Sequence, residues 1–201
     1  MNVLRVVLLA ALASLLTVPA YAADMKLIGT SGTENVGGYW AGLYTLTADG
    51  DTLLAMCDDF YTHVGNGDTW TANRYTYADL TGNPALAKFA PLTKYSQAGW
   101  LLSLLGGSST AHQRGITNAA IWKIMNPSVD KFDTNSEVMG LYDSATDGTH
   151  NGFDFSHVMV VWTPDPKSAS QEFLQPVPEP ATVLLFLSGI SMLLLVRRRG
   201  R

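Results

Sequence analysis

The 201-residue chain contains a single cysteine, Cys57, so it cannot form an internal disulfide. Basic residues are also scarce, with 13 Lys and Arg against 17 Asp and Glu. Removing Arg5 and the four arginines of residues 197–201 leaves eight of the 13 basic residues, and removing Glu179 leaves 16 of the 17 acidic ones. Residues 23–177 therefore carry a formal net charge of −8. Because phosphate binding needs clustered Lys and Arg, this composition excludes nucleic acid as a partner.

Catalytic and cofactor motifs are missing as well. The chain contains no G-x-S-x-G elbow, no H-E-x-x-H motif and no phosphate-binding loop. Asp58, Asp59 and His63 are ligand types, but no third ligand stands at a useful spacing, and a polar strand edge explains these residues equally well. We therefore expect no enzyme active site, no bound cofactor and no metal.

The C-terminus has three successive parts. A short motif is followed by an uncharged apolar run of 16 residues (181–196) and by a basic end. The motif is Val177, Pro178, Glu179 and Pro180, and the basic end contains Arg197, Arg198, Arg199 and Arg201. An apolar run of this kind suits a transmembrane helix, although it is shorter than the roughly 20 residues of an ordinary span. The positive-inside bias places the basic tail, residues 197–201, in the cytoplasm.

This arrangement resembles the PEP-CTERM sorting signal of exopolysaccharide-producing bacteria. The resemblance implies a membrane partner, an exosortase, that cuts near the motif, so that an inner-membrane-anchored precursor becomes a mature protein at the cell surface or outside the cell. An ordinary C-terminal anchor is the alternative. The sequence alone leaves open whether the mature protein is released or attached.

The N-terminus independently predicts export. Arg5 precedes an apolar stretch from Val6 to Val18, and Ala20-Tyr21-Ala22 forms an A-x-A site before Ala23. Residues 1–22 are therefore predicted to be a signal peptide. Reading the apolar stretch as a buried helix would leave the charged flank and the small-residue site unexplained.

Residues 23–174 are long enough for one domain and too short for two. Alternating and apolar segments bounded by glycines predict strands, and longer apolar segments predict helices. The predicted strands are Met25–Gly29, Tyr39–Thr47, Thr52–Cys57, Phe60–Val64, Thr69–Tyr77 and His157–Trp162; the predicted helices are Leu92–Leu105, Thr110–Met125 and Ser136–Ala145. The fold class is α+β, an antiparallel sheet or barrel-like domain with a helical insertion. The proline-rich segment 163–180, and residues 175–180 above all, are expected to link the domain to the membrane.

Cys57 has three possible uses in an exported protein: burial, pairing with another chain, or chemistry. It ends an apolar segment and leads into Asp58-Asp59-Phe60. Together with three later segments, this region resembles the thioester domains of bacterial surface adhesins. The later segments are Tyr95–Leu102, Thr117–Trp122, and Val160–Pro164 followed by Gln171-Glu172-Phe173-Leu174.

The resemblance implies that a cysteine condenses with a glutamine, losing ammonia, and that the thioester then acylates an amine on a target. The position matching the glutamine is Asn118, one methylene shorter, so Cys57 and Asn118 are the candidate thioester pair. Gln113 lies about 140° around the predicted helix from Asn118 and is expected to face elsewhere. Asp58 and Asp59 are expected to raise the pKa of the thiol. A buried structural cysteine is the competing interpretation.

Aromatic residues are dense in the predicted sheet. They could stack on sugars of an exopolysaccharide, but core packing is the stronger interpretation for most of them. They are Tyr39, Trp40, Tyr44, Phe60, Tyr61, Trp70, Tyr75 and Tyr77. The sequence thus predicts an exported surface or matrix protein that binds without catalysis, associated with exopolysaccharide or biofilm. The alternative is a covalent adhesin that uses Cys57.

Overall fold

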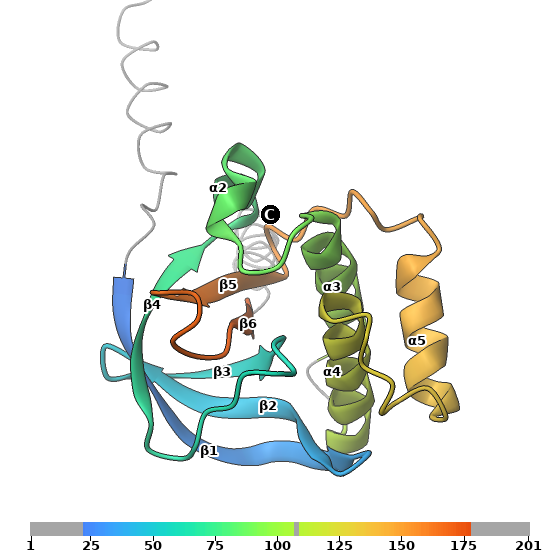
Figure 1. The fold of residues 1–201 in the computed structure, drawn as a ribbon, viewed down its shortest axis with the longest axis horizontal. Coiled ribbons are helices and arrows are strands. Elements are labelled where there is room, and N and C mark those ends of the chain that lie inside the picture. The colour runs from blue at the N-terminus through green and yellow to red at the C-terminus, as the bar shows by residue number, and fades with distance from the viewer. Residues whose placement is uncertain (1–21, 107–108, 178–201) are drawn as a thin grey trace, which may run out of the picture.

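Six antiparallel strands close into a barrel in a computed structural model that describes residues 22–106 and 109–177 (Figure 1). The order around the barrel is β1-β2-β3-β6-β5-β4. The strands are β1 (Ala22–Val36), β2 (Tyr39–Ala48), β3 (Asp51–Cys57), β4 (Thr69–Tyr75), β5 (Met159–Pro164) and β6 (Phe173–Pro176). The barrel-like α+β fold expected from the sequence is confirmed.

Strand β1 shows how the sequence produces this barrel. Ala23, Met25 and Leu27 are buried, whereas the residues between them are exposed. This period of two places one face of the strand in the core and the other in water. The first part of β1 pairs with β4 and most of its length pairs with β2, so this one strand joins two sides of the barrel.

The β1–β2 pairing is irregular near Gly29 and Gly32, and this irregularity helps to position the site described below. The register shifts twice, between Leu27 and Gly29 and between Gly29 and Gly32. A Cβ on Gly42 would lie 2.8 Å from the backbone oxygen of Gly32, and Gly42 has a φ of +131°. Only glycine fits this close approach and this conformation without strain. As a result, the Gly42 N–H is directed at helix α4 and donates to Asn118.

Helices occupy the chain between β4 and β5 (Figure 1). Helix α4 packs against β1 and β2 and also contacts its helical neighbours α3 and α5. The helices are α2 (Tyr77–Gly82), the 3₁₀ turn η1 (Pro84–Leu86), α3 (Thr93–Ser103), α4 (Ala111–Met125) and α5 (Ser136–Thr146). The three predicted helices are therefore confirmed within two residues at each end. Their central member, α4, is buried from Thr117 to Met125.

Two sequence predictions are wrong. Residues 60–64 form no strand, because the Asp59 carboxylate accepts hydrogen bonds from the N–H groups of Tyr61 and Thr62 and turns the chain (both 3.1 Å). The segment 163–180 is not simply a linker either. It contains β6, which runs to Pro176 and closes the barrel between β3 and β5. Its proline is the last residue of the strand, and the next residue, Val177, still donates its N–H to the Val158 carbonyl at 2.8 Å.

The terminal predictions lie largely outside the described residues. These are the signal peptide up to Tyr21, the motif from Pro178 onward, the apolar run 181–196 and the basic tail 197–201. Ala22 and Ala23, which flank the predicted cleavage point, begin β1. Within residues 22–106 and 109–177, no helix has both the length and the apolar character needed to cross a bilayer.

Candidate functional site around Cys57

Cys57 lies at the end of β3, fully buried, where β3 pairs with β6. It stands opposite Phe173, and the Asp58 N–H donates to the Glu172 carbonyl at 3.2 Å. This register brings the segment just before β6, which includes Gln171, next to the cysteine. The strand pairing thus brings together the end of β3 and the start of β6, two segments that are far apart in the sequence.

The side chains of Cys57 and Gln171 share one hydrogen-bond acceptor. The Cys57 thiol donates to the Asp59 carbonyl oxygen at 3.1 Å, and Nε2 of Gln171 donates to the same oxygen at 3.2 Å. Gln171 is itself buried. The thiol and the side-chain amide thus converge on one backbone oxygen.

The surroundings of Cys57 keep its thiol protonated. Burial raises the pKa of the thiol well above its usual value, and the neighbouring carboxyl groups of Asp58 and Asp59 raise it further. The nearby Trp122 side chain acts in the opposite direction and lowers the pKa of the thiol. The effect expected of the neighbouring aspartates is therefore confirmed. A buried, protonated thiol of this kind reacts poorly with reagents in solution.

Asn118 also approaches Cys57, but through the backbone. Its Nδ2 donates to the Cys57 carbonyl at 2.6 Å, and its Oδ1 accepts from the Gly42 N–H at 2.8 Å. Asn118 is fully buried, so its amide ties β3 to β2 from helix α4. The pairing of Cys57 with Asn118 in a thioester stays a prediction. Its hydrogen bonds give this amide a positioning role, whereas the geometry favours Gln171 as the neighbour of the thiol.

Two buried carboxyl groups follow the two candidate residues in the chain: Asp58 after Cys57 and Glu172 after Gln171. They hydrogen-bond to each other, which requires one shared proton. Burial and the charge of Glu172 raise the pKa of Asp58 well above its usual value, so the proton resides on Asp58. Glu172 accepts from the hydroxyl groups of Tyr95 and Thr163. Its charge is thereby satisfied without water.

Lys88 compensates the remaining buried charge. Its Nζ lies 2.6 Å from Oδ2 of Asp59 and 2.6 Å from the Ser170 carbonyl, and its side chain is only 12 % exposed. Lys88 therefore fixes both Asp59, which follows Cys57 and Asp58, and Ser170, which precedes Gln171. The candidate site is held by this buried network rather than by a surface loop.

The proton on Asp58 makes stability depend on pH. The folded protein retains a proton that the unfolded chain releases near the ordinary carboxyl pKa, so stability falls as the pH rises above about 4. In Asp58→Asn, an amide N–H should donate to Glu172 in place of the carboxyl proton. Because the amide does not titrate, the stability of this variant should no longer fall as the pH rises. We expect its Tm to exceed that of the wild type at neutral pH, by about 2–4 °C for each kcal/mol gained. The advantage should vanish near pH 4, and a pH-independent difference in thermal melts would contradict the assignment.

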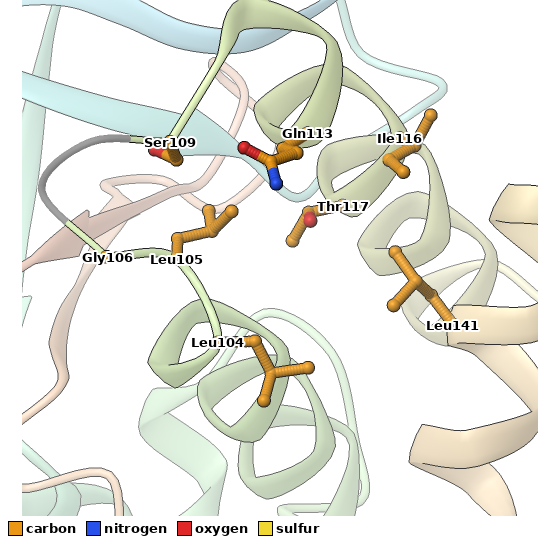
Figure 2. A pocket seen from close by; sticks show the side chains of 8 residues that line it. All are labelled: Leu104, Leu105, Gly106, Ser109, Gln113, Ile116, Thr117 and Leu141. Carbon is orange, nitrogen blue, oxygen red and sulfur yellow. The ribbon is translucent and has the colours of Figure 1, made fainter.

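A separate pocket of about 410 Å³ lies among α3, α4 and α5 (Figure 2). Its walls are Leu104, Leu105, Gly106, Ser109, Gln113, Ile116, Thr117 and Leu141. None of these residues is acidic, basic or a thiol. Gln113 hydrogen-bonds the Thr110 backbone at the start of α4, so it faces away from Cys57 as expected. This pocket offers no chemistry to the candidate site.

The aromatic residues divide between the core and the surface. Tyr44, Phe60, Trp70 and Tyr75 are buried, in agreement with core packing. By contrast, Trp40 is 59 % exposed and Tyr61 is 58 % exposed. Among the described residues, no group of His, Cys, Asp or Glu side chains is arranged to hold a metal ion.

No protein-family model matches this sequence, and no curated protein matches it. The fold is similar to a solved structure, the N-terminal thioester domain of a surface protein from Clostridium perfringens. The TM-score is 0.51 at 7 % sequence identity, and the match covers 77 % of this chain and 98 % of that domain. The architecture expected from the sequence resemblance is therefore present. At this identity the likeness concerns the fold alone.

The resemblance pointed to Asn118, whereas the structure also brings Gln171 to the end of β3 that carries Cys57. In the sequence, Gln171 belongs only to the late motif Gln171-Glu172-Phe173-Leu174. The sequence offers one indication that Gln171 could lie near Cys57. Gln171 stands just before an apolar segment, and that segment could pair as a strand with the segment that ends at Cys57. That pairing joins residues more than a hundred positions apart, and local periodicity carries no information about it.

Proposed function

We propose that this chain is an exported surface protein whose barrel domain forms an internal thioester between Cys57 and Gln171 and acylates an amine on an extracellular partner. The single observation that carries the proposal is the hydrogen bonding of both side chains to the Asp59 carbonyl oxygen. The thioester-domain fold supports it. The protein is then a single-use covalent binder and not an enzyme.

The chemistry is an acyl transfer. The sulfur of Cys57 attacks Cδ of Gln171, the bond from Cδ to Nε2 breaks, and the thiol proton leaves with the nitrogen as ammonia. Burial of both residues protects the product from hydrolysis. An attacking amine would later form an amide at the same carbon and return Cys57 to its thiol form.

Incubation with methylamine tests this function. We expect the mature protein to gain one methylamine, and peptide mapping by mass spectrometry to locate it on the Gln171 side chain. Cys57→Ala and Gln171→Ala should each abolish incorporation, while Gln113→Ala, at an exposed glutamine near the start of α4, should not. Incorporation that persists in Cys57→Ala, or an adduct on Asn118, would contradict the proposed pair.

A non-covalent binding role is the second candidate, and the exposure of Trp40 and Tyr61 favours it. Exposed aromatic rings can stack on sugars, so an exopolysaccharide or another surface ligand would be the partner. Processing by an exosortase and a place in a biofilm matrix belong to this proposal, through the C-terminal signal. Retention of the folded protein on the producing cell's own polysaccharide, unaffected by Cys57→Ala, would support this candidate.

A further inference from the structure

A pocket of about 260 Å³ opens beside the candidate thioester. Gln171 and Trp122 line it, and the Trp122 side chain lies close enough to Cys57 to lower the pKa of its thiol. The pocket therefore reaches the side chain that would carry the acyl group. Among the pockets described above, this is the one that contains a residue of the candidate pair.

The walls of this pocket are unusually aromatic. Tyr39, Trp40, Tyr44 and Phe60 line it, and the exposed Trp40 stands at its outer part. Aromatic faces attract cations, and they also pack against the methylene groups of an alkyl chain. A primary amine on an unbranched alkyl chain suits such walls in two ways. It arrives as an ammonium ion, which aromatic faces attract, and its methylene groups can pack against the rings as it extends inward to Gln171.

An ammonium ion cannot attack a carbonyl until it loses a proton, and the pocket holds one group suited to accept it. His63 lines this pocket and is exposed to solvent. It also lines a second pocket that includes Ser170, the residue before Gln171. An imidazole is the side chain whose charge changes near neutral pH, which suits a general base.

The other ionisable groups around His63 are less suited. Asp59 is paired with Lys88, and Asp68 accepts a hydrogen bond from the Gly65 N–H. Burial raises the pKa of Tyr44, so its hydroxyl stays protonated. Tyr39, the remaining ionisable side chain of the pocket, packs its ring against those of Phe60 and Phe132.

We propose that this aromatic pocket admits a primary alkyl amine to the thioester and that His63 accepts the proton of the attacking nitrogen. This inference rests on the proposed function. The ammonium ion first loses one proton through His63 to water. The amine nitrogen then bonds to Cδ of Gln171 and the bond from Cδ to the Cys57 sulfur breaks. The second proton of the nitrogen, also accepted by His63, passes to the departing thiolate. The products are an amide at Gln171 and a free thiol at Cys57.

The test measures the rate of amine incorporation between about pH 5.5 and 8.5 with cadaverine and with methylamine. His63→Gln should form the thioester, seen as loss of one ammonia in its intact mass, but react about 100-fold more slowly. The part of the pH dependence of the rate that requires His63 should disappear in His63→Gln, and added imidazole should partly rescue His63→Ala. Trp40→Ala should slow cadaverine more than methylamine. The control is His157→Gln, an exposed histidine outside this pocket, which should match the wild type.

The outcomes separate the two proposals. A thioester that forms in His63→Gln and reacts within twofold of the wild-type rate at every pH would overturn the role of His63 alone. Equal effects of Trp40→Ala on both amines would overturn the binding of an alkyl stem. Absence of any thioester in the wild type would overturn this inference together with the proposed function.

Discussion

Asn118→Ala is expected to lower the free energy of unfolding by about 2–4 kcal/mol and to prevent thioester formation. The substitution leaves two buried backbone groups without a partner: the Gly42 N–H and the Cys57 carbonyl. Each buried group left unpaired costs about 1–3 kcal/mol. Because water cannot reach this position, the loss has no ready replacement, and the end of β3 that carries Cys57 should shift relative to Gln171.

Urea denaturation and intact mass together check this result. The matched control is Asn73→Ala, which removes an asparagine whose amide makes one long hydrogen bond to Asp165 at the surface, 3.4 Å. We expect the control to lose less than about 1 kcal/mol and to retain the thioester. An Asn118→Ala protein with wild-type stability and full ammonia loss would show that the amide has no positioning role.

Lys88→Met is expected to cost about 3 kcal/mol or more, because it leaves the Asp59 carboxylate buried without its cation. It also releases the Ser170 carbonyl, which precedes Gln171. The expected readouts are a lower urea midpoint and incomplete thioester formation. Lys26→Met, at an exposed position of β1, is the control and should be nearly neutral.

A second substitution distinguishes charge from packing. Lys88→Met combined with Asp59→Asn removes the uncompensated charge while keeping the oxygen that accepts from Tyr61 and Thr62. The double variant should therefore be more stable than Lys88→Met alone. If the two unfold at the same urea concentration, the cost arises from the lost side-chain packing of the lysine and not from the buried carboxylate.

Local patterns were enough to predict most of the elements. The alternation in β2 and the apolar spacing in α3, α4 and α5 depend on neighbours in the sequence and predict these elements, whereas the apolar run Met25–Gly29 predicts only part of β1. The failures have physical causes. Asp59 captures two N–H groups and turns a segment that reads as a strand, and β6 is short and ends in proline.

The candidate site was only half predictable. Cys57 stood out because it is the single cysteine, and the segment containing Asn118 stood out by resemblance. The neighbour of the thiol, Gln171, is set by the β3–β6 register. Lys88, Tyr95 and Glu172 meet only in the folded chain, so the buried network that holds the site has no signature in the sequence.

The most direct test of the central claim is the intact mass of the purified mature domain, residues 23–177, compared with its Cys57→Ala and Gln171→Ala variants. The account predicts that the wild type weighs one ammonia less than its calculated mass and has no titratable thiol, while both variants have their full calculated masses. A wild-type protein of full calculated mass with a reactive thiol in the unfolded state would contradict the thioester and leave Cys57 as a buried structural residue.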